Sequence, residues 1–216
     1  MSGIAIQKIL KVRLTLMEEL LGTAPSDEEI YASYIASNAP EGKSIEDEIA
    51  TLGVEGVIEK GKTIFNKAAD GKPFLFDYHI KGFFKDSCGM LGRVAGKDEN
   101  GKKKKGVNES SNISAYKKII DGLIFVFPRQ IIINVNGDIG SCQRPLRGQT
   151  AQGEVVALAN SEAIPAGSTL EFEIHCLSLD HYKAVIEWLD YGQYRGLGQW
   201  RNSGKGRFTY EILSET

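Results

Sequence analysis

Apolar and polar residues alternate in three widely separated segments of the chain, and this period of two predicts half-buried β-strands. The segments are Ile4–Leu16, Thr169–Leu177 and Arg207–Leu213. Shorter apolar runs predict three further strands, at Leu123–Phe127, Ile131–Val135 and Glu154–Leu158. The segment Arg144–Gln152 shows neither alternation nor an apolar run, so we expect an irregular polar loop there.

Helical spacing of apolar residues appears in two other segments. Asp77–Val94 carries an apolar stripe at helical offsets and lies between Pro73 and Gly96, and His181–Asp190 carries a second stripe, with Asp180 as the expected N-cap. A helix is also expected over Ser111–Ile120, and a capping-box pattern beginning at Ser26 predicts a short helix through about Ser37.

The order of these elements predicts an α+β fold with a ferredoxin-like, RNA-recognition-type core and insertions. The two strong helices each lie between strands, which gives the βαβ…βαβ frame of that fold. We expect a single domain over residues 1–216, with an acidic insertion at about 18–60 and a flexible lysine-rich loop at about 96–108. A weakly patterned stretch at 44–58 falls inside the acidic insertion.

The composition limits the classes of protein to consider. The 216 residues are 42% hydrophobic, which allows a substantial core, and no apolar run approaches the roughly 20 residues of a membrane span. The three cysteines, Cys88, Cys142 and Cys176, are too few and too widely spaced to predict a disulfide framework or a zinc site. Because no secretory signal is recognisable either, we expect a cytoplasmic protein without metal or cofactor.

Charge is distributed unevenly along the chain. Residues 18–59 contain eleven acidic residues and one lysine, a charge of −10, so the remainder carries +8 of the total of −2. Such asymmetry is typical of a protein with a polyanion-binding face and an acidic back. A solvated acidic loop without a partner is the alternative explanation.

Glycine, basic and aromatic residues are concentrated in one loop, Tyr191–Arg207. It holds five glycines and four basic residues, and no acidic residue occurs between Asp190 and Glu211. Glycine allows close approach of the backbone to a phosphate, arginine binds phosphate oxygens in pairs, and aromatic rings stack on bases. The loop therefore predicts nucleic-acid binding, although a mobile hairpin of small residues is the simpler alternative. The expected contacts are Tyr194, Arg195, Gly196, Gly198, Trp200, Arg201, Lys205, Gly206 and Arg207.

Two other segments are weaker candidates for phosphate contacts. The start of the Asp77–Val94 helix carries Lys81 and Lys85, and the loop after Cys142 carries Arg144 and Arg147. The stretch 56–63 matches the spacing of a phosphate-binding P-loop, but no apolar strand leads into it, so we interpret the match as chance.

Candidates for catalysis are scarce. No arrangement of a nucleophile with a base, and no spacing of metal ligands, is recognisable, so no catalytic or metal-binding residue is predicted. His79 lies near Lys81 and Asp77 in the sequence and could act as an acid or base on RNA. A surface or capping histidine is the more ordinary interpretation of His79.

Three segments together resemble the repeat-associated mysterious protein (RAMP) superfamily, which includes RNA-binding backbone subunits and RNA-processing endonucleases of CRISPR systems. Residues 76–85 resemble the helix-opening segment of that family, residues 167–174 its late strand, and residues 194–207 its glycine-rich loop before the last strand. The loop departs from the family pattern by an insertion at 199–203. The chain also resembles bacteriophage proteins of this general type, which implies a viral origin and a bacterial host cell.

The resemblance implies a ligand and a set of partners. It implies a non-catalytic protein that grips the phosphate backbone of single-stranded nucleic acid, with RNA favoured, and that self-associates into a filament or ring. One alternative is a phage interaction protein that mimics or inhibits a host CRISPR effector subunit and would therefore bind effector subunits. A second alternative is a metal-independent RNA endonuclease. No membrane association is expected.

Overall fold

The computed structural model describes residues 8–26, 62–94, 96, 99–101, 105–150 and 153–216, without the side chains of residues 146–158. The strands are β1 (Lys8–Leu16), β2 (Leu20–Leu21), β3 (Ala24–Pro25), β4 (Thr63–Ile64), β5 (Asn66–Lys67), β6 (Pro73–Phe76), β7 (Ile124–Phe127), β8 (Gln130–Asn134), β9 (Gly140–Thr150), β10 (Gly153–Ile164), β11 (Thr169–Cys176) and β12 (Phe208–Glu215). The helices are α3 (Asp77–Val94), α4 (Glu109–Asn112), α5 (Tyr116–Leu123) and α6 (Leu179–Arg195), with a 3-10 turn, η1, at Arg201–Ser203.

The main sheet confirms the predicted α+β, ferredoxin-like fold. Its strand order is β12-β1-β11-β8-β6-β5, with β7 also paired to β11. β1 lies between β11 and β12 and is antiparallel to both, and β7 is antiparallel to β11. The chain therefore runs through β1, α3, β7–β8, β11, α6 and β12, which is the βαββαβ order of that fold.

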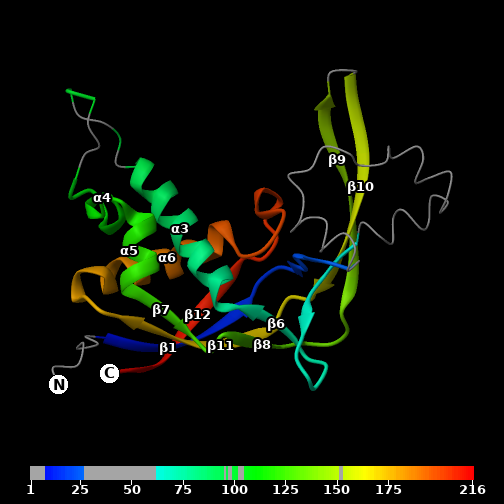
Figure 1. Cartoon of the computed structure of the whole chain (residues 1–216), viewed down its shortest axis with the longest axis horizontal. Helices are drawn as coiled ribbons and strands as arrows, with labels where there is room; N and C mark the ends of the chain where they lie inside the picture. The colour runs from blue at the N-terminus through cyan, green and yellow to red at the C-terminus, as the bar shows by residue number, and fades with distance from the viewer. Residues whose placement is uncertain (1–7, 27–61, 95, 97–98, 102–104, 151–152) are drawn as a thin grey trace.

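The helices cover one face of this sheet (Figure 1). Alternate residues of β1 and β11 are fully buried beneath them, as in Leu14 and Phe172. Trp188 of α6 and Phe84 of α3 pack against each other with ring centroids 5.4 Å apart, and both are completely buried. The alternation of the strands and the stripes of the helices thus meet in one hydrophobic core.

The predicted helices differ from the observed ones mainly at their ends. α3 is confirmed over its whole length. The single helix expected over 111–120 is two helices, α4 and α5, separated by Ala115 in the left-handed conformation with φ of 49°. α6 begins earlier than expected because the Ser178 side chain, and not Asp180, is the N-cap and accepts a hydrogen bond from the Asp180 backbone N–H.

The prediction of an irregular loop over Arg144–Gln152 is wrong for the residues up to Thr150. They belong to β9, which forms a long antiparallel hairpin with β10, from Gly140↔Ala163 to Thr150↔Gly153. The hairpin extends away from the helices (Figure 1), and β10 also pairs with β2 and β4. Backbone hydrogen bonds between the two strands hold β9 in place. These bonds do not require apolar side chains, so the sequence of β9 shows no apolar alternation from which a strand could be predicted. Apart from Ser26, the helix expected at 26–37 lies outside the described residues, as do the stretch 44–58 and most of the P-loop match.

Candidate nucleic-acid interface

The loop between α6 and β12 has a tightly closed backbone that only glycine allows. Gly206 has φ of 72°, and a Cβ at this position would lie 2.0 Å from the carbonyl oxygen of Leu197. The Leu197 N–H donates a 2.8 Å hydrogen bond to the Gly206 carbonyl, and the Leu197 side chain is buried. Gly196 and Gly198 also have positive φ and closely approach neighbouring atoms. These glycines therefore shape the loop itself.

The C-terminal part of the loop is anchored to the connection between β1 and β2. Lys205 Nζ lies 2.6 Å from Glu19 Oε2, and Arg207 Nη2 lies 2.9 Å from Glu18 Oε1. The Gly206 N–H donates a 2.8 Å hydrogen bond to the Glu19 carbonyl. The hydrogen bond and charge of Glu19 raise the pKa of the Lys205 ammonium group. Lys205 and Arg207 thus each pair with an acidic residue. Both partners lie at the start of the acidic insertion, which was expected to form the acidic back of the protein.

The start of the predicted loop, Tyr191–Arg195, is the last turn of α6, and this turn and the loop after it are anchored to α3 through one carboxylate. Asp86 Oδ2 accepts hydrogen bonds from Arg195 Nε at 2.8 Å and from Arg201 Nη1 at 2.9 Å. Arg195 Nη1 also donates to the side chain of Asn202 at 2.7 Å. The loop sequence itself contains no acidic residue. In the folded protein it nevertheless has an acidic partner, Asp86, which lies more than a hundred residues earlier in the chain.

Trp200 is held at the centre of the loop in an unusual conformation. Its backbone is left-handed, with φ of 53°, and its side chain is 38% exposed. The guanidinium group of Arg144 lies over the indole ring at 5.4 Å from its centroid. Arg144 itself is 5% exposed and donates hydrogen bonds to Ser161 Oγ at 3.0 Å and to Gln199 Oε1 at 2.7 Å. Arg144 is therefore placed to support the indole ring from beneath.

These residues make up a surface that we call the glycine-loop surface. Its members are Arg144, Arg195, Trp200, Arg201, Lys205 and Arg207, and Tyr194 precedes Arg195 in the last turn of α6. Five of them are cations, and the carboxylates paired with them are Glu18, Glu19 and Asp86, so the cluster has a formal charge of +2. Tyr194 is 71% exposed at the end of α6. The surface thus combines a partly exposed aromatic ring with an excess of positive charge, as a single-stranded nucleic acid requires.

The other predicted contacts are not all part of this surface. Lys85 Nζ pairs with Asp121 at 2.6 Å, and Lys81 Nζ donates to the Asp121 carbonyl at 3.1 Å, so both lysines face α5. Asp86, which binds the loop, is turned by about 100° from Lys85 around α3. Burial lowers the pKa of Lys81. Arg147 pairs with Val156 in the β9–β10 hairpin, and its side chain is outside the described part.

A second cluster of rings and charge, which the sequence did not reveal, lies at the start of α3. Phe76 and Tyr78 stack with ring centroids 5.2 Å apart, and His79 lies 4.5 Å from Tyr78. Arg129, from the turn between β7 and β8, lies 5.5 Å from the centroids of Phe76 and Tyr78. The sequence shows aromatic residues at 76–79, where a helix was expected to begin, but nothing in it indicated the contact with Arg129.

His79 is fixed within this cluster. Its Nδ1 lies 3.2 Å from the Phe76 N–H, which donates to it, and its Nε2 lies 3.2 Å from Thr23 Oγ1. Burial lowers the pKa of the imidazole, so the ring is neutral near pH 7. This geometry gives His79 a structural role; its use as an acid or base on RNA stays a prediction. In the described part of the chain, no three His, Cys, Asp or Glu side chains gather as a set that could hold a metal ion.

The open face of the main sheet is dominated by ion pairs. Arg13 contacts Glu171 at 2.8 Å and Glu211 at 3.3 Å across neighbouring strands, and Lys11 contacts Glu171 at 3.8 Å. RNA-recognition domains use the equivalent face for aromatic rings that stack on bases. The same face also carries Phe127, which is 48% exposed and whose ring lies 4.8 Å from that of His175. Aromatic rings are therefore present on this face as well as at the glycine-loop surface and the start of α3.

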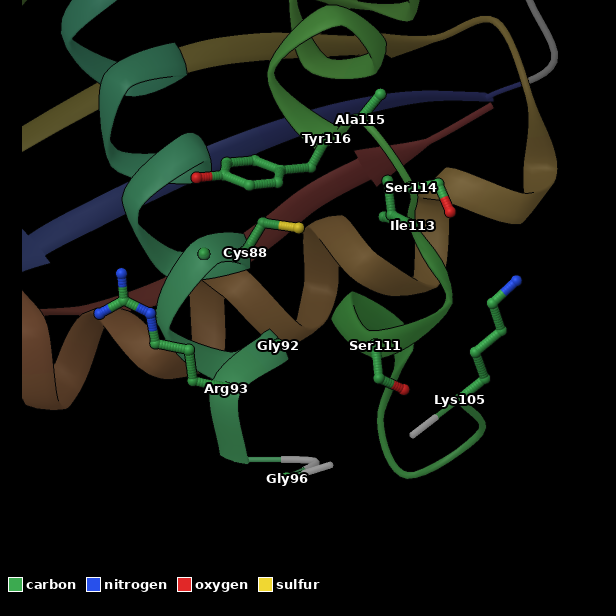
Figure 2. A pocket seen from close by; sticks show the side chains of 11 residues that line it. Cys88, Gly92, Arg93, Gly96, Lys105, Ser111, Ile113, Ser114, Ala115 and Tyr116 are labelled. Carbon is green, nitrogen blue, oxygen red and sulfur yellow. The ribbon is translucent and has the colours of Figure 1, made fainter. Parts of the chain in front are cut away.

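A hollow of 680 Å³ lies elsewhere, between the second half of α3 and the α4–α5 connection (Figure 2). Arg93 and Lys105 stand on opposite sides of it, and Cys88 and Tyr116 line its inner end. None of the residues predicted to bind nucleic acid lines this hollow. The volume of this hollow is therefore no evidence that it belongs to the candidate nucleic-acid interface.

Comparison with known proteins supports the fold. No protein-family model matches the chain, and no curated protein matches it in sequence. Among solved structures, the chain is similar to one in the cryo-EM structure of the type III-B Cmr-beta bound to cognate target RNA, with a TM-score of 0.50 and 12% identity. The match covers 97% of this chain and 60% of that one, so this protein spans about three fifths of its structural neighbour.

At this identity the likeness shows the fold alone. It agrees with the α+β, ferredoxin-like fold that the sequence predicted, and membership of the RAMP superfamily stays a prediction. A bacteriophage origin, self-association into a filament or ring, and binding to CRISPR effector subunits stay predictions. Across the described stretches, no helix combines the length and apolar character that crossing a membrane needs.

Proposed function

We propose that this protein binds single-stranded RNA, without cutting it, through the glycine-loop surface. The observation that carries the proposal is the position of Trp200, whose partly exposed ring rests on the buried Arg144 and is followed directly by Arg201 in the loop. A left-handed backbone at a residue other than glycine is strained, and such strain is concentrated at functional sites. The RNA named for the structural neighbour supports RNA over DNA as the ligand.

The ion pairs of the loop are compatible with phosphate binding. The side chains of Arg201 and Asp86 are 29% and 26% exposed, so their ion pair is partly open to solvent. A guanidinium group carries five N–H donors, and Asp86 engages Nη1 of Arg201. A phosphate can therefore bind the same arginine from the solvent side while Asp86 holds its orientation.

The proposal is tested by titrating a fluorescently labelled single-stranded RNA with the protein and measuring anisotropy. We expect binding at about 50 mM salt that weakens steeply toward about 200 mM salt, since backbone contacts release counterions. A duplex of the same RNA serves as the control and should bind more weakly, because its paired bases cannot stack on Trp200. Absence of binding to the single strand at low salt would refute the proposal.

A further inference from the structure

The rings at the start of α3 border a hollow of their own. Its volume is 340 Å³, and Thr23, Asn66, Tyr78 and His79 are among the residues that line it. This volume lies near the lower end of the range of about 300–1,000 Å³ that is usual for ligand sites. Tyr78 is 50% exposed, so one edge of the hollow is open to solvent. The space suits one small ligand with a flat, aromatic shape.

The orientation of the rings favours a stacking ligand. Phe76 and Tyr78 are nearly parallel, with an interplanar angle of 17°, and the His79 ring is within 15° of parallel to Phe76. Arg129 lies over Phe76 and Tyr78, and its Nη1 is fixed by Asp77 at 2.8 Å. A further planar ring can extend such a stack, and the nearby guanidinium adds positive charge for a phosphate attached to it.

Polar groups in the hollow match the edge of a nucleobase. His79 Nδ1 lies 3.2 Å from the Phe76 backbone nitrogen and 3.3 Å from the Phe76 carbonyl oxygen, and its Nε2 lies 3.2 Å from Thr23 Oγ1, so the imidazole and the Thr23 hydroxyl are held in place. The Thr23 hydroxyl keeps at least one lone pair with which it can accept a hydrogen bond from a ligand. The Asn66 side-chain amide can both donate and accept. Donors and acceptors of both kinds are what the edges of purines and pyrimidines require.

The hollow is also connected to the glycine-loop surface. Thr23 follows Gly22, whose carbonyl accepts a 2.8 Å hydrogen bond from Gln199 Nε2, and Gln199 in turn accepts one from Arg144 beneath Trp200. One short segment of backbone therefore contributes to both places. A single strand lying on the glycine-loop surface can reach the hollow across this segment.

We propose that the hollow at the start of α3 binds one nucleobase, stacked on Tyr78, with its phosphate near Arg129. The base belongs to the RNA strand bound at the glycine-loop surface, so this inference rests on the proposed function. A free nucleotide presents the same ring and phosphate, and the experiment below separates the two sources. Neither the sequence resemblance nor the structural neighbour assigns this site.

The test is photo-cross-linking with 5-iodouridine, which forms a covalent bond to an aromatic side chain stacked on it. Single-stranded RNA containing 5-iodouridine, and 5-iodouridine monophosphate alone, are irradiated separately with the full-length protein, and the modified peptides are identified by mass spectrometry. We expect the RNA to cross-link at Tyr78. The variant Tyr78→Ala should bind RNA at least about five-fold more weakly, whereas Tyr78→Phe, which keeps the ring, should bind within about two-fold of wild type.

The outcomes separate this site from the proposed function. RNA binding without a cross-link at Tyr78, together with unchanged affinity of Tyr78→Ala, would overturn the site and leave the proposed function intact. A complete lack of RNA binding would refute the proposed function and, with it, the assignment of the base to a bound strand. Cross-linking of the monophosphate alone would support a base site whose natural ligand is a free nucleotide.

Discussion

The guanidinium carbon of Arg144 lies 5.4 Å from the centre of the Trp200 ring. Arg144 belongs to β9 and Trp200 to the connection between α6 and β12, so this contact joins the base of the hairpin to the loop. A cation over an aromatic ring contributes up to about 2 kcal/mol when it is removed from water, and Arg144 is 5% exposed. The contact thus holds the candidate interface in one shape.

Replacement of Arg144 by lysine should destabilise the protein. Lysine keeps the charge but loses the planar fork that contacts Ser161 and Gln199, so we expect the free energy of unfolding to fall by about 1–3 kcal/mol. Urea denaturation measures this change. Arg129→Lys is the matched control, since Arg129 has a side chain that is 68% exposed and should cost less than about 1 kcal/mol. Equal losses in the two variants would contradict the role given to Arg144.

The loop glycines permit a second matched comparison. Gly206 and Gly204 have φ of 72° and 80°, but an added Cβ meets the Leu197 carbonyl at 2.0 Å in the first and nothing closer than 3.4 Å in the second. Gly206→Ala should therefore lower the free energy of unfolding by more than about 2 kcal/mol, and Gly204→Ala by about 1 kcal/mol. Thermal or urea denaturation of both variants gives the answer. A smaller loss for Gly206→Ala than for Gly204→Ala would show that the loop is not closed in this way.

Removal of the charge on Asp86 should strengthen RNA binding. In Asp86→Asn, Arg195 and Arg201 no longer have a carboxylate partner, and both become more available to phosphate. We expect higher affinity at low salt and a salt dependence that is steeper by about 0.7 for each additional phosphate that the protein neutralises. The measurement is anisotropy with labelled RNA at several salt concentrations.

Asp121→Asn is the control for this effect. It removes the partner of Lys85 on the side of α3 that faces α5, so RNA affinity should stay near that of wild type. If Asp121→Asn strengthened binding and Asp86→Asn did not, the RNA would lie along Lys81 and Lys85 and not on the glycine-loop surface.

Burial of His79 should make stability depend on pH. The pKa of the folded-state imidazole is lowered below its ordinary value of 6.5. At a pH between the folded-state pKa and the ordinary pKa, His79 binds more protons in the unfolded chain than in the folded one. The stability that the neutral imidazole contributes is therefore complete above the ordinary pKa and is lost as the pH falls toward the folded-state pKa. The difference in unfolding free energy between about pH 7.5 and pH 5.5 should be smaller in His79→Gln than in wild type. An unchanged difference would contradict the buried, neutral imidazole.

The sequence predicts most of the core because the core follows local periodicity. α3 is recognisable from its apolar stripe, and Phe208 begins the last strand as the alternation indicates. β9 is not predictable from the sequence, because it is held by backbone pairing with β10, for example of Arg144 with Ala159, and this pairing requires no apolar pattern. The alternation of β1 is visible in the sequence, whereas its central place between β11 and β12 is set by pairing over more than 150 residues.

The candidate site is less predictable because its charges meet from distant segments. The loop sequence shows cations and glycines but not Asp86, whose contact with Arg195 spans 109 residues. Arg144 is buried and contacts Trp200, a partner that the sequence did not indicate, and its contact with phosphate stays a prediction. The hollow beside Tyr78 likewise depends on Arg129, which arrives from a turn that no local pattern relates to α3.

The affinity of Trp200→Ala for single-stranded RNA tests the central claim most directly. It should be measured by anisotropy at low salt beside Trp200→Phe, after circular dichroism has shown that both variants are folded. If the RNA stacks on this ring, Trp200→Ala should lose about 1–3 kcal/mol of binding free energy, at least about five-fold in affinity, while Trp200→Phe keeps most of it. Wild-type affinity in Trp200→Ala would contradict binding of RNA at the glycine-loop surface.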